Sequence, residues 1–158
     1  MSADGPIAKL VWHPYGPKTP YWPEIGAAAV GDGVATLAGG AVTVGRFVVQ
    51  AADDGYFDMC GNQAVKISAL AASKATTAGD QLRLIPCLTN MLWAIMYAGT
   101  HTLVATDIGT EFGMDSDGKF DTDNTTQDLF LLLGFDDTWA YVTIDPALIV
   151  GLGGSCEA

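Results

Sequence analysis

The densest run of groups that could do chemistry lies between residues 115 and 123. Four carboxylates stand within this stretch: Asp115, Asp117, Asp121 and Asp123. Carboxylate oxygens are preferred ligands of Ca²⁺, and an aspartate-rich loop with a central glycine is the pattern of an EF-hand. Aligning Gly118 with that glycine places Gly113 and Asn124 where the first and last ligands, an aspartate and a glutamate, belong. The pattern therefore predicts a solvated acidic turn and no metal site.

The two histidines, His13 and His101, lack a recognisable nucleophile beside them, and the chain has no G-x-S-x-G elbow. The glycines of residues 31–33 lack the spacing of a nucleotide-binding loop. The acid pairs 53–54 and 136–137 lie in turn contexts. They leave one enzyme alternative, a small β-barrel hydrolase whose carboxylates converge in a cleft. We expect no catalytic residue, no cofactor and no enzymatic activity.

Three cysteines, Cys60, Cys87 and Cys156, are odd in number, far apart and without metal-binding spacing. This arrangement predicts free thiols of a reducing compartment. The first residues lack the basic and apolar regions of a secretory signal. The longest apolar stretch, residues 84–98, is shorter than the roughly 20 residues that span a bilayer. We expect a soluble chain made in the cytoplasm.

The net charge of -11 comes from 18 acidic and 7 basic residues. Binding to phosphates needs clustered Lys and Arg, and the basic residues here are scattered singly, so we expect neither nucleic acid nor an anionic membrane as a partner. The acidity is concentrated, because residues 1–106 carry a net -1 and residues 107–158 a net -10. Only 16% of the residues are charged, against about 25% in an ordinary soluble domain. Such a surface predicts contact with other chains.

Residues 1–25 predict an extended N-terminal arm. Five of the seven prolines lie in its first 23 residues, and proline disfavours both helix and regular strand. Aromatic side chains alternate with these prolines, and such side chains gain stability only where they pack. Two outcomes stay open: the arm folds back over its own body, or it docks on a neighbouring chain. The expected protein-binding side chains of the arm are Trp12, His13, Tyr15, Tyr21 and Trp22.

Residues 26–106 predict a β-rich body. Short apolar runs such as 41–49 and 81–85 alternate with glycine-containing turns, which is typical of an all-β sandwich or barrel. One or two helical turns are the alternative for residues 69–78. Residues 91–97 are apolar at both alternating sets of positions, which indicates a strand covered on both faces. The expected fold class is a compact all-β barrel or sandwich with an extended arm and C-terminal β-hairpins.

Residues 107–158 predict an acidic β-hairpin region within the same domain. A two-residue turn at Asp117-Gly118 would pair Met114 with Asp121. A second turn at Asp136-Asp137 would pair Phe135 with Thr138, which gives one aliphatic core face and a second face for another sheet layer or a partner subunit. The expected protein-binding side chains on the second face are Phe130, Leu132, Trp139 and Tyr141, with Trp139 opposite Gly134.

Two stretches resemble the head decoration, or cement, proteins of tailed bacteriophages. They are residues 106–126 (TDIGTEFGMDSDGKFDTDNTT) and residues 129–137 (LFLLLGFDD). Residues 79–86 (GDQLRLIP), followed by an aromatic-bearing strand, are similar in style. The resemblance covers residues 64–145 and rests on pattern, without an invariant catalytic signature.

The resemblance implies a structural virion protein, made in the host cytoplasm, that binds the exterior of an icosahedral head. Such proteins stabilise contacts between major capsid subunits as homo-oligomers, here with a trimer favoured and a dimer next. No catalytic or metal residues come with the resemblance. From the charge distribution we expect the near-neutral part and the arm to meet partners, with the acidic turns around Asp117 and Asp136 facing solvent. The alternative function is a carbohydrate-binding or surface-binding β-module.

Overall fold

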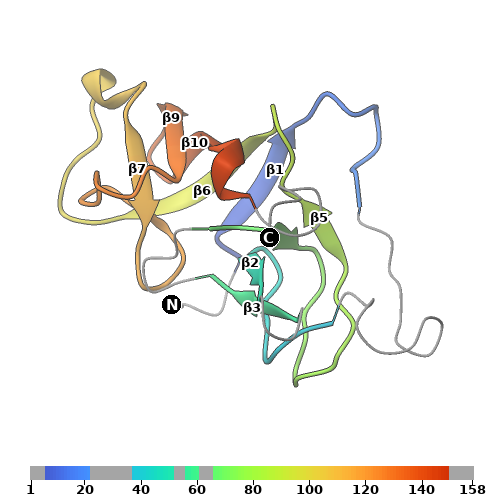
Figure 1. The fold of residues 1–158 in the computed structure, drawn as a ribbon. Coiled ribbons are helices and arrows are strands. Elements are labelled where there is room, and N and C mark those ends of the chain that lie inside the picture. Colours follow the sequence, from blue (N-terminus) through green and yellow to red (C-terminus); the bar gives the residue numbers. More distant parts are fainter. Residues whose placement is uncertain (1–5, 22–36, 52–55, 61–65, 150–158) are drawn as a thin grey trace.

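The computed structural model describes residues 6–21, 37–51, 56–60 and 66–149. This part of the chain is almost entirely strand and turn, which confirms the expected all-β fold. Figure 1 shows a curved group of strands beside a smaller sheet. The strands are β1 (Ala8–Trp12), β2 (Phe47–Gln50), β3 (Phe57–Met59), β4 (Ala69–Ala71), β5 (Leu84–Pro86), β6 (Leu92–Ala98), β7 (Glu111–Met114), β8 (Phe120–Asp121), β9 (Phe130–Phe135) and β10 (Trp139–Ile144). Two short 3-10 turns are η1 (Ala105–Asp107) and η2 (Pro146–Leu148).

Five strands close a barrel in the order β6, β10, β9, β7 and β8. The closing contact is parallel and pairs Tyr97 of β6 with Phe120 of β8. β1 pairs antiparallel with the earlier part of β6, so the same edge of β6 carries β1 first and β8 afterwards. Closure satisfies the backbone groups that an open sheet would leave at its edges.

A smaller antiparallel sheet has the order β3, β2, β4 and β5. Its two faces alternate along each strand. Phe47 and Leu70 pack into the main core with the barrel, whereas Val48 and Ala69 belong to a second cluster with Phe57. The sheet is therefore apolar on both faces.

Aromatic rings join the smaller sheet to the barrel. Phe47 meets Trp93 edge to face at 5.3 Å between ring centroids and Phe130 at 6.0 Å. Phe120 continues the cluster to Phe112 at 4.7 Å. Such pairs contribute about 0.5–1.5 kcal/mol each beyond the burial of their area. Because Phe47 comes from the smaller sheet and the other rings from the barrel, the two units share one core.

The barrel sheet draws its strands from all three of the expected ranges, 1–25, 26–106 and 107–158. The barrel sheet takes β1 from the expected arm and β6 from the expected body, and the smaller sheet ends at Pro86. The poor strand propensity predicted for the arm is wrong for residues 8–12, because the window between Pro6 and Pro14 is free of proline and Ile7 and Ala8 are buried. The helical alternative for residues 69–78 is also wrong, since Ala69–Ala71 is strand β4.

The β7–β8 hairpin has a wider loop than the predicted two-residue turn. Met114 pairs with Phe120, one position away from the predicted partner Asp121. Asp115 Oδ1 accepts the backbone N–H groups of Asp117 and Lys119 at 2.8 and 2.9 Å. In this loop only Gly118 has a positive φ, +85°, whereas a type I′ turn needs two such residues. The slip of one residue brings Phe120 into the core beside Met114.

The β9–β10 hairpin is also shifted. Asp136 N–H donates to the carbonyl of Trp139, so the loop holds four residues, and Tyr141, not Trp139, lies opposite Gly134. The register then shifts between Tyr141 and Val142, which leaves Leu133 without a partner in a β-bulge. The Asp136 carboxylate widens the loop because it captures two backbone N–H groups that a tight turn would place elsewhere.

Candidate functional site

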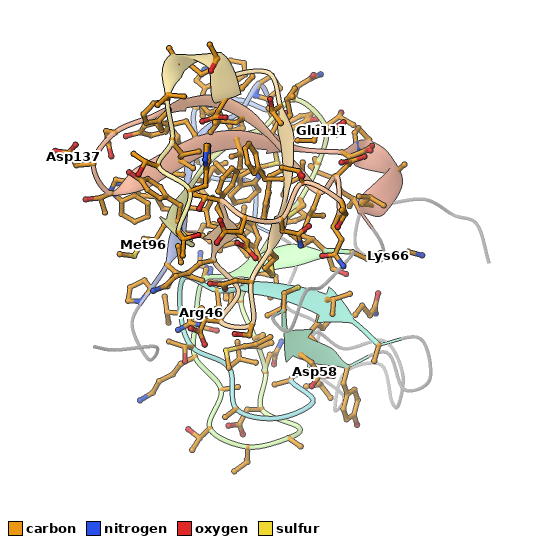
Figure 2. All side chains as sticks on the ribbon, turned by 90° about the vertical axis from the view of Figure 1, so that its left-hand side faces the viewer. Arg46, Asp58, Lys66, Met96, Glu111 and Asp137 are labelled. Atoms are coloured by element: carbon orange, nitrogen blue, oxygen red, sulfur yellow. The ribbon has the colours of Figure 1, made fainter. Side chains whose placement is uncertain are left out.

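One outer sheet face brings the arm and the second hairpin together. Across this face Lys9 of β1 pairs with Ala94 of β6, and Ala94 pairs with Tyr141 of β10. Trp139 pairs with Met96 one step along the same face. Figure 2 shows Met96 and Asp137 on the same side of the molecule. We call this surface the aromatic face, which consists of Lys9, Trp12, Leu92, Met96, Trp139 and Tyr141.

Trp12 reaches the aromatic face because of a bulge in β1. The register shifts between Leu10 and Trp12, so that Trp12 pairs with Leu92. Without the extra residue Val11, side-chain alternation would turn Trp12 to the opposite face. Its side chain is 57% exposed, the highest fraction among the large apolar residues that the structure describes. The bulge therefore presents a tryptophan to solvent beside the hairpin aromatics.

Lys9 and Trp139 form a cation–π contact on this face. The Nζ atom of Lys9 lies 4.5 Å from the centroid of the Trp139 ring. A contact of this kind at an exposed site contributes about 0.5–1 kcal/mol. It also restricts the indole, because the lysine stem covers one side of the ring.

Asp136 holds the other aromatic residue in place. Its Oδ1 atom accepts the backbone N–H groups of Thr138 and Trp139 at 2.9 and 2.7 Å, and its Oδ2 atom accepts the Tyr141 hydroxyl at 2.8 Å. The backbone N–H groups of Trp139 and Thr138, followed by the Tyr141 hydroxyl, lower the pKa of Asp136. The hydrogen bond to Asp136 raises the pKa of Tyr141. The ring of Tyr141 is thus oriented before any partner arrives.

The Asp136 turn borders this face. The carbonyl of Asp136 also accepts the Tyr97 hydroxyl at 2.7 Å. Asp136 is itself exposed, as expected for an acidic turn that faces solvent. At the other turn Gly118 is buried, and the carbonyl of Asp117 accepts Nη1 of the buried Arg46 at 2.7 Å. Figure 2 shows Arg46 where the barrel meets the smaller sheet, so the backbone of the Asp117 turn packs inside the molecule.

The later arm residues lie away from the aromatic face. The Tyr15 hydroxyl donates to the Thr89 carbonyl at 2.6 Å, and the Arg83 guanidinium lies 3.8 Å from the centroid of the Tyr21 ring. His13 stacks on Tyr15, with ring centroids 6.2 Å apart. Through residue 21 the arm therefore contacts its own chain. Trp22 lies outside the described residues.

Two of the four residues predicted for the hairpin contact belong to the core. Phe130 and Leu132 are 0% exposed because the bulge at Leu133 turns them inward beside Val142. That part of the prediction is wrong, and the outer face of the hairpin carries Trp139 and Tyr141 instead. The width of the loop depends on the Asp136 side chain, which accepts two backbone N–H groups. Neither that loop nor the bulge can be predicted from the alternation of apolar and polar residues alone.

A polar cluster at residues 99–125 was missed by the sequence reasoning. Nε2 of His101 lies 2.9 Å from Oδ2 of Asp107, which also accepts the Val104 N–H at 2.8 Å. Asp123 accepts the backbone N–H groups of Thr100 and His101 at 2.7 and 3.0 Å. These hydrogen bonds lower the pKa of both carboxyl groups, with backbone donors as the largest cause. No spacing in the sequence predicts the contact between His101 and Asp107. The hydrogen bonds that Asp107 and Asp123 accept from backbone N–H groups cap turns.

In residues 6–21, 37–51, 56–60 and 66–149, no group of three or more His, Cys, Asp or Glu side chains converges to hold a metal ion. Within these ranges no helix has the length and apolar character to cross a bilayer. Cys60 and Cys87 are free thiols, as predicted, and both are buried. Cys156, the 53–54 acid pair and residues 31–33 lie outside the described residues.

The fold and this surface define a β-barrel protein with exposed aromatic side chains on one outer sheet face. A comparison with protein-family models finds no match, and neither does a comparison with curated proteins.

Proposed function

We propose that the protein is a capsid decoration protein, a structural virion component that binds the outer surface of an icosahedral phage head. In this role it binds without catalysis and stabilises contacts between major capsid subunits. The observation that carries the proposal is the aromatic face, where Trp12, Trp139 and Tyr141 share one side of β1, β6 and β10. The resemblance of residues 106–137 to head decoration proteins supports the choice of partner.

The energetics of the aromatic face suit a repeated protein contact. Tryptophan and tyrosine contribute most per residue in protein interfaces, and rigid side chains lose little entropy on binding. Lys9 restricts Trp139, and Asp136 restricts Tyr141. On a symmetric shell each modest contact is multiplied by the number of copies, so one protomer needs no exceptional affinity. A homo-oligomer, with a trimer favoured over a dimer, would add this avidity.

The proposal can be tested with expanded, DNA-free heads assembled from the major capsid protein encoded in the same genome. Full-length protein is titrated onto these heads, and occupancy is measured by sedimentation. Trp12→Ala and Trp139→Ala should each weaken binding by about tenfold or more, as expected for interface tryptophans. The matched control is Val104→Ala, because Val104 is exposed and lies at the N-cap of the η1 turn, outside the aromatic face. Unchanged occupancy with both tryptophan variants would overturn the assignment.

Point substitutions test this contact better than deletion of the arm. Removing residues 1–23 would also remove β1, which pairs with β6 along Leu92–Ile95. A loss of binding would then report damage to the sheet. Each variant should therefore first be matched to the parent chain by its urea unfolding midpoint.

The second candidate function is a carbohydrate-binding module. The exposed ring of Trp12 favours it, because exposed aromatic rings can stack on sugars. A glycan array separates the two functions. Saturable binding to a defined glycan, lost in Trp12→Ala and accompanied by no head binding, would replace the capsid assignment with this one.

A further inference from the structure

β1 is the outermost strand of the six-stranded sheet, and among the described residues no strand pairs with its outer edge. The Met96 N–H donates to the Ile7 carbonyl, so that carbonyl points toward β6, whereas the N–H groups of Ile7 and Ala8 both donate to the Gly45 carbonyl, at 3.0 and 2.9 Å. Successive residues of an antiparallel strand direct their backbone groups to opposite edges. The N–H and carbonyl of Leu10 therefore point away from β6, on the same side as the N–H of Ala8.

A groove of about 470 Å³ follows this open edge. The backbone of residues 8–11 forms one side, Leu70 and Ile85 contribute to its floor, and Pro17 and Tyr21 of the arm form the opposite side. Figure 1 shows the segment after β1 looping out on the side of β5. Since proline lacks the N–H that a strand must donate, the proline-rich arm is poorly suited to pair with β1.

The rim of the groove is apolar and exposed. Val11 is 45% exposed and Val44 is 41% exposed, and both line it beside Tyr21. Among the described residues, no Asp or Glu lines the groove, whereas Lys9 and His13 do. Arg83 adds a positive charge behind Tyr21. In a chain of net charge -11, an acidic segment meets the least repulsion here.

We propose that this groove binds an extended segment of a partner protein, which adds to the edge of β1 as a further strand. The segment has apolar side chains at alternate positions, where they contact Val11 and Val44, and acidic residues at its ends. Backbone hydrogen bonds to Leu10 give it affinity, and the apolar rim and Lys9 select its sequence. The groove shares Lys9 with the aromatic face, but the proposal does not depend on the capsid assignment.

The test uses three capped synthetic peptides added to ¹⁵N-labelled full-length protein. Each has the same seven residues of alternating valine and threonine, flanked by two aspartates, two serines or two lysines. We expect affinity to fall from the acidic to the basic peptide by about tenfold or more, since complementary charge favours the first. Hydrogen exchange at the Leu10 amide should slow by about tenfold or more when the acidic peptide saturates the protein.

N-methylated peptides test the strand geometry. Methyl groups on the amides of one edge remove the donors that face β1, whereas methyl groups on the other edge leave them intact. The acidic peptide should lose binding when the methyl groups are on the edge that faces β1, and should keep it when they are on the other edge. Equal effects of the two methylation patterns, or no change at any β1 amide with any peptide, would overturn the proposal.

Matched substitutions locate the site on the protein. Val44→Asp should weaken binding of the acidic peptide by about tenfold or more, because it removes an apolar contact and adds a like charge. Val104→Asp is the control, since Val104 is similarly exposed, at 47%, and does not line the groove. Equal weakening by both variants would contradict the site. A concentration-dependent dimer that Val44→Asp abolishes would assign the groove to a second copy of the chain and overturn the partner proposal.

Discussion

Lys9 and Trp139 meet although their strands are not neighbours. Lys9 belongs to β1 and Trp139 to β10, with β6 between them, and the Lys9 Nζ atom lies 4.5 Å from the centroid of the indole ring. The side chain of Lys9 therefore passes over the row that contains Ala94, which is 0% exposed. This contact links the first strand of the chain to the last and orders the aromatic face.

Replacing Lys9 by methionine tests that link. Lys9→Met keeps much of the apolar stem but removes the charge over the ring, so we expect a loss of about 0.5–1 kcal/mol in the free energy of unfolding. Urea unfolding measures it. Lys18→Met, in the exposed arm, should stay within about 0.5 kcal/mol of the parent. Equal effects of the two variants would show that the contact contributes no stability.

The Asp136 turn should make stability depend on acid pH. Because hydrogen bonds from Trp139, Thr138 and Tyr141 lower the pKa of Asp136 in the folded state, the carboxylate stabilises the fold above the ordinary aspartate pKa of about 4. That contribution is lost as the pH falls through the lower folded value. The stability of Asp136→Asn should therefore fall less steeply than that of the parent chain below about pH 4.

The control for the acid-pH prediction is Asp137→Asn in the same turn. It removes one formal charge and leaves the Asp136 hydrogen bonds in place. Urea midpoints measured at several pH values give the three profiles. A profile for Asp136→Asn as steep as that of Asp137→Asn would contradict the role of this carboxylate.

Gly118 should tolerate alanine less well than Gly109 does. Both residues have positive φ, +85° and +91°, but a Cβ atom on Gly118 would lie 2.8 Å from the Cys60 carbonyl oxygen, whereas one on Gly109 would meet nothing within 4 Å. Alanine in this backbone region costs about 1–2 kcal/mol at either site. Gly118→Ala should lose about 1–3 kcal/mol more, from the forced contact. Similar unfolding midpoints for the two variants would refute the tight packing of the Asp117 turn.

The buried Arg46 should stabilise the joint between the barrel and the smaller sheet. Its Nη1 atom donates to the Asp117 carbonyl at 2.7 Å. Arg46→Met keeps an apolar stem and leaves this carbonyl without its charged donor, which should lower the free energy of unfolding by about 1–3 kcal/mol. Lys74→Met at an exposed position should change it by no more than about 0.5 kcal/mol. If Arg46→Met left the free energy of unfolding unchanged, the hydrogen bond between Arg46 and the Asp117 carbonyl would contribute no stability to this joint.

The buried thiols should resist alkylation in the folded protein. Burial raises the pKa of Cys60 to about 12, and burial together with Cys60 raises the pKa of Cys87. Since the thiolate is the reactive form, iodoacetamide at neutral pH should label these two cysteines only after urea is added. Peptide mass spectrometry distinguishes them from Cys156. Rapid labelling of either one without urea would contradict its burial.

Much of the fold could be predicted from patterns that depend on near neighbours. Alternating apolar residues and turn-forming glycines predicted the all-β class, and the two apolar faces of residues 91–97 predicted a covered strand, which is β6. The structure buries Trp93 and Ala94, which lie on opposite faces of that strand. These predictions agree with the structure because side-chain alternation is a property of the strand itself.

The register of the hairpins could not be predicted in this way. Asp115 and Asp136 each capture two backbone N–H groups and widen their loops. In β9 the bulge at Leu133 adds a slip of one residue, which reverses the side chains that precede it and places Phe130 and Leu132 in the core. The predicted anchors Trp139 and Tyr141 stayed outside because their own strand has no bulge.

The sequence by itself determined the all-β class, the absence of charge clusters for nucleic acid, and the choice of aromatic residues as contact candidates. Each depends on composition or local periodicity. Only the tertiary structure decided that Trp12 joins Trp139 and Tyr141, because that requires the pairing of β1 with β6, the pairing of β6 with β10 and the bulge at Val11. These contacts span more than a hundred residues, and their geometry is set by closure of the barrel, which no local pattern contains.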